Sequence, residues 1–208
     1  VINIVTGMDG PAIGKTLCDD DRIRKMTFTG STEVGRILMR QSAGTLKKMS
    51  LELGGNAPLI VFDDADIDTA IAGTMASKYR NAGQTCVCAN RIFVQDGIYD
   101  EFARCLTEAT AAMKVGNGME DGVEQGPIID GQGLDKIERH VADARAKGAE
   151  VLTGGGRHAL GGTYFEPTVL TGMTPEMEMF REETFGPVAG LFRFSTDDEA
   201  VACLLYTS

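Results

Sequence analysis

The chain has 208 residues, which is enough for one large domain or two small ones. It carries 20 basic and 30 acidic residues, and the resulting net charge of -10 argues against a nucleic-acid partner. No apolar run approaches the roughly 20 residues that cross a bilayer, so we expect no membrane partner either.

Apolar runs alternate along the chain with patterns of helical spacing. Strands are expected at residues 2–5, 26–29, 46–53, 57–62, 91–94, 150–152, 168–170 and 188–194. Helices are expected at 11–17, 33–43, 67–79, 99–113 and 134–147, and another begins within 195–202. Because strands alternate with helices, we predict an α/β fold with mostly parallel sheets.

The five cysteines are odd in number and irregular in spacing, which argues against a secreted disulfide framework. With only two histidines and no Cys-x-x-Cys pair, we expect no metal site. Cys18 and Cys105 are interpreted as small buried residues. Reduced thiols make the cytoplasm the expected location, although a sequence that starts inside a strand says nothing about targeting signals.

The two ends of the sequence favour an internal segment of a longer protein. The chain begins directly in the strand expected at 2–5, without a methionine. The last six residues, Cys-Leu-Leu-Tyr-Thr-Ser at 203–208, change character without a helix-capping signal. They are also what TGT-CTC-TTA-TAC-ACA-TCT encodes, a string that matches a transposon-end sequencing adapter. We therefore predict a non-native tail at 203–208, with a natural short strand as the alternative.

A Gly-Ser-Thr turn joins the strand expected at 26–29 to the next helix. Residues 28–35 are Phe-Thr-Gly-Ser-Thr-Glu-Val-Gly. A helix amino terminus offers free N–H groups and partial positive charge to a phosphate, and Gly30 permits close approach of a ligand to the backbone. The spacing is Gly-x-x-x-x-Gly and not the dinucleotide fingerprint Gly-x-Gly-x-x-Gly. A nucleotide site and a plain capped helix both fit this pattern.

Glu52 interrupts an apolar run, Ser-Leu-Glu-Leu-Gly-Gly, at 50–55. A carboxylate between Leu51 and Leu53 is either a charge at a sheet edge or a functional group in a cleft. Partial removal of water by the leucines would favour proton uptake and would suit a general base. The residues alone leave both interpretations open.

A short polar loop at 83–88, Gly-Gln-Thr-Cys-Val-Cys, places Cys86 after the helix expected at 67–79. A thiolate is a strong nucleophile and is stabilised by nearby positive charge, and Arg80 precedes it in the sequence. In an extended segment Cys88 would face the same side as Cys86. Cys88 is either a packing residue or a redox partner of Cys86, although a bridge across one residue is strained.

A second acidic motif, Glu-Glu-Thr-Phe-Gly-Pro at 182–187, precedes the strand expected at 188–194. Its carboxylates could bind sugar hydroxyls, and Phe185 could stack on a ring. A solvated acidic turn is the alternative interpretation.

Taken together, these motifs resemble those of the aldehyde dehydrogenase superfamily. Phe-Thr-Gly-Ser-Thr, Leu-Glu-Leu-Gly-Gly, Gly-Gln-x-Cys and Glu-Glu-x-Phe-Gly-Pro occur in that order, and the resemblance covers residues 1–202. The stretch 79–90 looks most like that of succinate-semialdehyde dehydrogenases, because many relatives for uncharged aldehydes lack an arginine at the position of Arg80. The resemblance implies the C-terminal part of a Rossmann-type cofactor domain at 1–53 and most of an α/β catalytic domain at 54–202.

The resemblance implies an NAD(P)-dependent oxidation of an aldehyde to a carboxylic acid. Cys86 would attack the aldehyde, and Glu52 would draw a proton from the water that hydrolyses the thioester. Arg80 would pair with the far carboxylate of the substrate, which is expected to be succinic semialdehyde. Glutarate semialdehyde or another ω-carboxy aldehyde is an alternative, because an arginine recognises a carboxylate and not a chain length. Acyl transfer to coenzyme A and a non-catalytic relative are further alternatives.

The same resemblance implies NAD or NADP as cofactor. The family's ribose-binding carboxylate matches Glu183, and Phe185 packs beside it. The family's phosphate loop matches four positions, Gly30, Ser31, Thr32 and Gly35. The residue that distinguishes NAD from NADP lies outside the sequence. We expect the complete enzyme to be a homo-oligomer and the 208 residues alone to be inactive.

Overall fold

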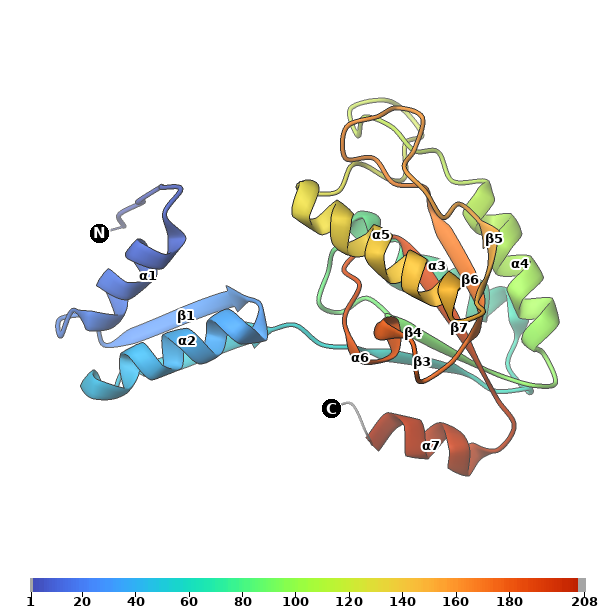
Figure 1. The fold of residues 1–208 in the computed structure, drawn as a ribbon, viewed down its shortest axis with the longest axis horizontal. Coiled ribbons are helices and arrows are strands. Elements are labelled where there is room, and N and C mark those ends of the chain that lie inside the picture. Colours follow the sequence, from blue (N-terminus) through green and yellow to red (C-terminus); the bar gives the residue numbers. More distant parts are fainter. Residues whose placement is uncertain (1, 206–208) are drawn as a thin grey trace. The chain divides into compact units, whose positions relative to one another are not determined.

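The chain forms two compact units, which divide between Gly54 and Gly55. The computed structural model describes residues 2–205 (Figure 1). The boundary expected after residue 53 lies beside this division, and the assignment of a cofactor domain and a catalytic domain stays a prediction. Within the described range, no helix combines the length and the apolar character needed to cross a membrane.

The first unit is a two-stranded sheet with two helices. In chain order it contains α1 (Gly10–Asp19), β1 (Lys25–Gly30), α2 (Thr32–Ser42), the 3-10 turn η1 (Ala43–Thr45) and β2 (Lys48–Leu53). The two strands are parallel, from Lys25 opposite Lys48 to Gly30 opposite Leu53. Helix α2 contacts both strands and also packs against α1.

Residues 2–5 do not form the strand that the sequence predicts. They have no regular secondary structure, and the side chains of Ile2, Ile4 and Val5 are 79% to 91% exposed. An apolar strand needs a pairing partner and a surface that covers its side chains, and the described residues provide neither. The remaining expected strands and helices are confirmed, within a few residues of their predicted bounds.

The second unit is built on a five-stranded sheet. In chain order it contains β3 (Pro58–Val61), α3 (Ile67–Lys78), the 3-10 segment η2 (Arg80–Gly83), β4 (Arg91–Gln95), α4 (Tyr99–Ala111), α5 (Gly131–Ala146), β5 (Glu150–Thr153), β6 (Thr168–Met173), α6 (Glu178–Arg181), β7 (Val188–Phe194) and α7 (Asp197–Leu205). The strand order is β3-β4-β7-β6-β5. Neighbouring strands are parallel except for the edge pair β5 and β6. The predicted α/β fold with mostly parallel sheets is confirmed.

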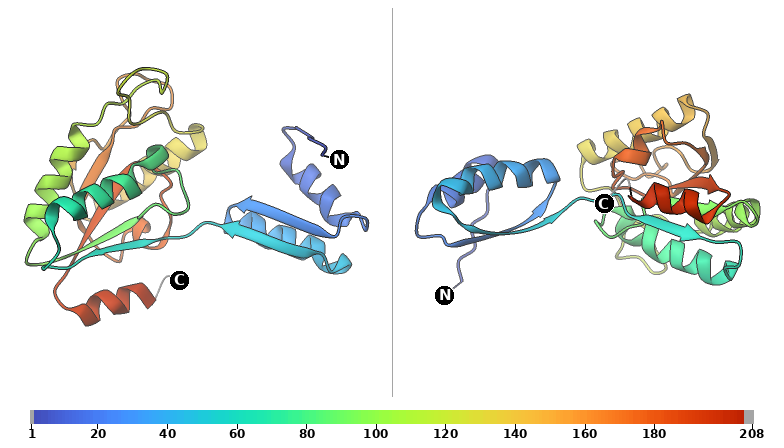
Figure 2. Two further views of the ribbon diagram at one scale, coloured as in Figure 1. Left: turned by 180° about the vertical axis from the view of Figure 1, so that it is seen from behind. Right: turned by 90° about the horizontal axis from the view of Figure 1, so that it is seen from below.

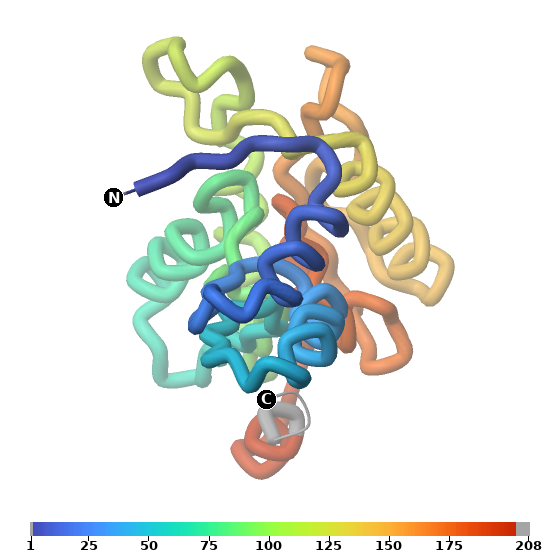
Figure 3. The backbone as a smooth tube through the Cα atoms, turned by 90° about the vertical axis from the view of Figure 1, so that its left-hand side faces the viewer, coloured from blue at the N-terminus to red at the C-terminus, as the bar shows by residue number. Residues whose placement is uncertain are grey.

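Helices cover both faces of this sheet. One hydrophobic core lies under α3 and α4, and the other lies under α5 and α6. Figure 2 shows these layers from two further sides, and Figure 3 shows α3 in teal and α5 in yellow on opposite sides of the sheet. In β4, Phe93 belongs to the core under α5, whereas Ile92 and Val94 belong to the other core. This alternation is expected for a parallel strand that is buried on both faces.

The segments that precede three parallel strands meet at one edge of the sheet. Pro58 and Gly190 both lie opposite Arg91, and the Asn90 N–H donates to the Ala57 carbonyl at 2.9 Å. Residues 55–57, 84–90 and 182–187 therefore gather where β3, β4 and β7 begin. The motifs around Cys86 and at 182–187 thus belong to the amino edge of the sheet, whereas many open α/β folds bind ligands at the carboxyl edge.

Only part of the predicted tail at 203–208 can be assessed. Residues 203–205 continue helix α7, so the alternative of a short strand is wrong for them. Residues 206–208 lie outside the described residues. The non-native origin of 203–208 stays a prediction.

Cys18, Cys86, Cys88 and Cys105 are free thiols. Cys18 is fully buried, as expected. Cys105 is half-buried, and the Arg104 guanidinium contacts its sulfur at 3.3 Å. The expectation that Cys105 is buried is wrong, because α4 turns Phe102, Ala103 and Leu106 toward the core and leaves Cys105 at its flank.

Replacing Leu106 by alanine is expected to lower the free energy of unfolding by about 2–5 kcal/mol, because its side chain is fully buried under α4. Leu160→Ala is the matched control, since Leu160 is largely exposed and should change stability by less than about 0.5 kcal/mol. Urea unfolding of the 208-residue chain measures both. Equal effects would contradict the assigned core.

Candidate active site

Cys86 lies in an exposed turn between η2 and β4. The Cys88 N–H donates to the Thr85 carbonyl at 3.1 Å and closes this turn. Cys86 is exposed, whereas Cys88 is buried. The expectation that the two cysteines face the same side is therefore wrong, because residues 85–88 turn and are not extended.

The backbone before Cys86 is held in the left-handed region at three consecutive residues. Asn81, Ala82 and Gly83 have φ values of 52°, 56° and 70°. Such values are uncommon for residues other than glycine and accumulate at functional sites. Gly83 also approaches another segment closely, since a Cβ at this position would stand 2.1 Å from the Gly186 carbonyl oxygen. The loop before Cys86 and the motif at 182–187 are therefore in direct backbone contact.

The side chain of Gln84 anchors the same loop to a third segment. Its Nε2 donates to the Asn81 carbonyl at 3.2 Å and to the Pro127 carbonyl at 3.3 Å. Its Oε1 accepts the Ile129 N–H at 2.9 Å. These bonds fix the backbone on both sides of the turn, so the exposed thiol of Cys86 stands on a rigid support.

Cys88 and Lys78 form a buried pair beneath the turn. The Cys88 sulfur lies 2.6 Å from the Thr85 hydroxyl oxygen. Lys78, at the end of α3, is almost fully buried, and burial lowers its pKa from 10.5 to about 8. The negative charges that Cys88 and Glu183 carry when ionised oppose this shift. A buried ammonium thus faces the Cys88 thiol and the carboxylate of Glu183.

Glu183 is half-buried in the segment that precedes β7. Burial raises the pKa of its carboxyl group, and the charges of Lys136 and Lys78 together with a hydrogen bond from the backbone of Gly55 work against this shift. Gly55 also links Glu183 to the nucleophile loop, since a Cβ at Gly55 would lie 4.0 Å from the Cys86 carbonyl oxygen. The structure therefore brings Glu183 and the loop of Cys86 to the same place.

Phe185 contributes to a cavity next to this loop. Its φ of 55° is left-handed, and its ring is partly exposed. A cavity of about 490 Å³ is lined by Asn81, Gln84, Pro127, Ile128, Ile129, Thr163 and Phe185. The ring predicted to pack beside a cofactor thus stands at the wall of an open space.

A buried amide, Asn90, ties these segments together. Its Nδ2 donates to the Asn56 side-chain oxygen and to the Glu182 carbonyl, and its Oδ1 accepts the Thr184 N–H at 3.1 Å. Asn56 in turn donates to the Phe180 carbonyl at 2.8 Å. The residues on both sides of Glu183 are therefore bound to the start of β4.

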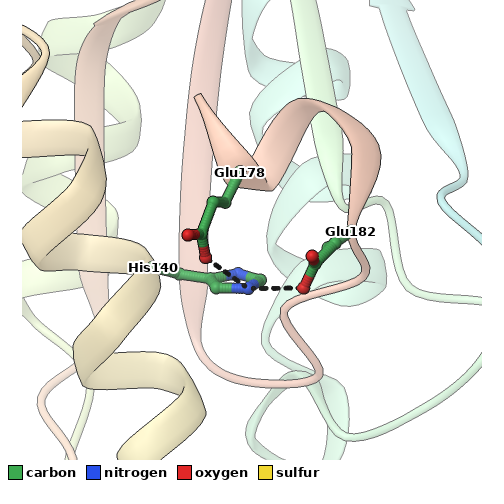
Figure 4. Close-up of side chains that lie close together, drawn as sticks. All are labelled: His140, Glu178 and Glu182. Carbon is green, nitrogen blue, oxygen red and sulfur yellow. Dashed lines mark hydrogen bonds and ion pairs between the residues drawn. The ribbon is translucent and has the colours of Figure 1, made fainter. Parts of the chain in front are cut away.

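His140 on α5 lies beside the same motif, together with Glu178 and Glu182 (Figure 4). The ring is fully buried, with its Nε2 3.4 Å from Glu182 and 3.8 Å from Glu178. The three side chains could offer a metal donor atoms within 4.8 Å of one another. The guanidinium of Arg139 already binds both carboxylates, at 2.9 Å and 3.2 Å. A cation is thus present among these carboxylates, and we assign no metal there.

Arg80 begins η2 and is exposed. Its carbonyl oxygen lies 3.9 Å from the Cys88 sulfur, so its backbone belongs to the same loop as the cysteines. Within residues 2–205 its guanidinium has no carboxylate partner at ion-pair distance. It is therefore available to an external anion.

The first unit carries the phosphate-loop motif. Ser31 caps α2, since its hydroxyl oxygen accepts the Val34 N–H at 3.2 Å, and Thr32 begins the helix. Gly35 serves packing, because a Cβ there would stand 2.7 Å from a methyl group of Leu53. Helix geometry leaves the first N–H groups after Gly30 and Ser31 without partners in the helix. The motif thus combines a capped helix with free N–H donors.

Glu52 also belongs to the first unit. It lies on β2 opposite Thr29, and its side chain is exposed. Leu51 and Leu53 are half-buried and point to the other face of the strand. The expected shielding of Glu52 by its neighbouring leucines is therefore wrong, because adjacent side chains of a strand alternate between faces.

The fold places several residues beside the predicted ones that no sequence motif indicated. They are Lys78, Asn90, Lys136 and His140. Lysines within helices and an asparagine before a strand look like ordinary surface residues in sequence. The only local signal was the scarcity of histidine, since His140 is one of two in the chain.

The family model described as the aldehyde dehydrogenase family matches residues 1–204, and the chain belongs to this family. It is 58% identical to a 3-sulfolactaldehyde dehydrogenase of Pseudomonas putida. It is 54% identical both to the NADP+-dependent succinate-semialdehyde dehydrogenase of Escherichia coli K12 and to a glutarate-semialdehyde dehydrogenase of Pseudomonas aeruginosa. These matches cover 97% of this chain and 41% to 42% of the relatives, so the chain spans about two fifths of their length.

Solved structures of other proteins also match the fold of this chain. The crystal structure of succinate-semialdehyde dehydrogenase from Burkholderia pseudomallei has a TM-score of 0.94 to this chain at 57% identity. The match covers 96% of this chain and 41% of that one. The predicted aldehyde dehydrogenase fold is therefore confirmed.

Gly83→Ala is expected to lower the free energy of unfolding by more than about 2 kcal/mol, because the new Cβ would overlap the Gly186 carbonyl at a left-handed φ. Gly73→Ala is the control: Gly73 lies within α3 with no atom near the added methyl group, and alanine should stabilise that helix by up to about 1 kcal/mol. Thermal unfolding of the 208-residue chain compares them, and a neutral Gly83→Ala would contradict the backbone contact.

Lys78→Met should change how stability depends on pH. The buried ammonium titrates near 8 in the folded chain and near 10.5 when unfolded, so its burial penalty is full below pH 8 and vanishes toward pH 10.5. The stability of the variant relative to wild type should therefore fall by about 2–3 kcal/mol between pH 7 and 10. The exposed Lys114→Met is the control, and parallel pH curves for Lys78→Met and wild type would show that Lys78 is not buried as a cation.

Proposed function

We propose that the complete enzyme containing this chain oxidises an aldehyde with an anionic far end to the carboxylic acid, with NAD or NADP as cofactor. The observation that carries the proposal is the exposed thiol of Cys86 on a strained, anchored loop that also carries Arg80. Membership of the aldehyde dehydrogenase family supports the reaction class. The names of three close relatives, which all describe dehydrogenases of anionic aldehydes, support the substrate class.

Each step of the reaction has a residue suited to it. The Cys86 thiolate attacks the aldehyde carbon and forms a thiohemiacetal, whose oxyanion can accept a hydrogen bond from the Cys86 N–H. The nicotinamide cofactor supplies the hydride acceptor. A thioester on Cys86 remains, and Glu52 removes a proton from the water that hydrolyses it. The exposed carboxylate of Glu52 suits this role because its oxygens are open to water.

Each unit carries groups suited to one part of a nicotinamide dinucleotide. Glu183 offers a carboxylate for ribose hydroxyls, and Phe185 stands at the wall of a cavity of about 490 Å³. The first turn of α2, from Gly30 to Gly35, offers free N–H groups for a phosphate. Gly30, Ser31, Thr32 and Gly35 would hold the cofactor phosphates, and Glu183 with Phe185 would hold its nicotinamide ribose.

Succinic semialdehyde is the substrate that we propose first. Arg80 can bind its far carboxylate through two parallel hydrogen bonds. An uncharged aldehyde of similar length would leave this guanidinium unpaired and would lose a few kcal/mol of binding. Glutarate semialdehyde is a close alternative, because it carries the same end group on a longer chain.

A sulfonated aldehyde is a second candidate substrate. The relative with 58% identity is named a 3-sulfolactaldehyde dehydrogenase. A sulfonate presents three oxygens to a guanidinium where a carboxylate presents two, and both are anions that Arg80 could bind. The choice between them depends on the shape of the pocket around Arg80 and not on its charge alone.

We expect Arg80→Ala in the complete enzyme to lower kcat/KM for the preferred anionic aldehyde by about 100-fold, because one charge-assisted pair is lost. The value for butanal should change by less than about threefold, since butanal has no far anion. NADH and NADPH formation should be followed with succinic, glutaric and sulfonated aldehydes. Arg80→Lys keeps the charge without the planar fork and should give an intermediate value.

Three outcomes would change the proposal. Equal losses on charged and uncharged aldehydes would remove Arg80 from substrate recognition and leave the reaction in place. A wild-type preference for the sulfonated aldehyde would favour the second candidate. No reduced cofactor with any aldehyde, or wild-type rates in Cys86→Ala, would reject the dehydrogenase chemistry.

A further inference from the structure

Helix α5 holds the segment 178–184 with a row of polar side chains. Asp143 accepts the Glu178 N–H at 2.8 Å at the start of α6. One turn earlier, Arg139 binds the carboxylates of Glu178 and Glu182. His140 lies between these contacts and points into the same segment (Figure 4). None of these residues belongs to the chemical steps described above.

Polar groups lie next to both ring nitrogens of His140. Its Nε2 faces the carboxylate of Glu182 at 3.4 Å, and a carboxylate can only accept a hydrogen bond. The Arg139 guanidinium also lies 3.4 Å from Nε2, but it already donates to Glu178 and Glu182. We therefore assign the proton of the neutral ring to Nε2. Nδ1 is then an acceptor, and the hydroxyl of Thr184 donates to it across 3.1 Å. The ring thus contacts both sequence neighbours of Glu183: the carboxylate of Glu182 and the hydroxyl of Thr184.

Thr184 is held from two directions. Its side chain bonds to His140, and its backbone N–H bonds to Asn90. All three residues are buried, so a broken bond here would leave an unsatisfied polar group away from water. The peptide that carries Glu183 therefore has one orientation as long as both bonds are made.

We propose that His140 is a positioning residue for Glu183, and that its neutral ring holds this carboxylate in the orientation that binds the cofactor ribose. The inference rests on the proposed function, since it takes Glu183 as a cofactor ligand. Protonation of Nδ1 turns that atom from an acceptor into a donor. The Thr184 hydroxyl can then no longer donate to it and must turn, which releases one of the two restraints on the segment.

The charges around the ring set the pH range of this change. Lys136 and Arg139 on α5 disfavour the imidazolium, whereas Glu182 and Glu178 favour it, and Asp143 lies one turn further along the helix. Burial is the largest influence, and it lowers the pKa of His140 below its ordinary value of 6.5. The neutral ring is therefore kept through neutral pH and is lost only in acid.

Two amide substitutions separate the two ring atoms. In His140→Asn the side-chain oxygen can take the place of Nδ1 and accept from Thr184, whereas in His140→Gln the amide reaches toward Glu182 and leaves Thr184 without its partner. Thr184→Val removes the hydroxyl at nearly constant volume. We expect the Kd for NAD+ or NADP+, measured by calorimetry on the complete enzyme, to rise about tenfold in the Gln and Val variants and less than twofold in the Asn variant. KM for the cofactor should follow Kd, with kcat changed less than threefold.

The pH dependence gives a second readout. Cofactor Kd of the wild type should rise as the pH falls from 7 to 5.5, and His140→Asn should show less of this rise because asparagine does not titrate. Protonation of Glu183, whose pKa is raised by burial, also contributes to the rise of Kd, and this contribution remains in both proteins. Identical pH profiles, or equal Kd values for the Asn and Gln variants, would overturn the proposal.

Amide hydrogen exchange separates this inference from the proposed function. In the 208-residue chain, protection of residues 183–185 should fall about tenfold in His140→Gln and stay near wild type in His140→Asn. If the complete enzyme binds no dinucleotide but this difference is seen, the cofactor assignment fails and the positioning of Glu183 stands. If exchange is the same in both variants, the ring only fills space and the positioning role is wrong.

Discussion

The side-chain amide of Asn90 is the interaction on which the arrangement of the second unit's site depends. Through one buried group it binds the segment before β3 at Asn56, the start of β4 where it lies, and the segment before β7 at Glu182 and Thr184. A buried amide that lost these partners would destabilise the chain by about 1–3 kcal/mol per unsatisfied group. Three segments far apart in sequence therefore stay together at the amino edge of the sheet.

This edge combines a rigid backbone with unusual electrostatics. The left-handed conformations of Asn81 and Ala82 are sterically unfavourable and persist because Gln84 and the contact of Gly83 with Gly186 hold the loop from both sides. Cys86 is therefore exposed on a loop that these contacts hold in place. Beneath it, Lys78 places a cation in a buried environment, which is costly and is typical of functional sites more than of structural cores.

Local patterns predicted the elements, and contacts between distant residues decided the site. Ser31 and Asp66 cap their helices through neighbouring N–H groups, so those helix starts could be predicted from a few adjacent residues. The strand at 2–5 was wrong because pairing depends on a partner that no local pattern specifies. The predicted orientation of Cys88 was wrong because residues 85–88 form a turn, which the bond from the Cys88 N–H to the Thr85 carbonyl closes. Lys78 and His140 could not be found from sequence, because each acts through residues of a different element.

Two buried bases act on the segment that carries Glu183: the charge of Lys78 acts on its carboxylate, and the ring of His140 contacts its neighbours Glu182 and Thr184. Lys78 stays charged up to about pH 8 and faces Glu183 as a cation, whereas His140 stays neutral down to acid pH and accepts the Thr184 hydrogen bond. Only between these limits are both conditions met. Burial shifts both groups toward their neutral forms. It therefore widens the pH range in which the histidine is neutral and narrows the pH range in which the lysine is charged. The fold therefore lowers the pKa of both side chains below their ordinary values.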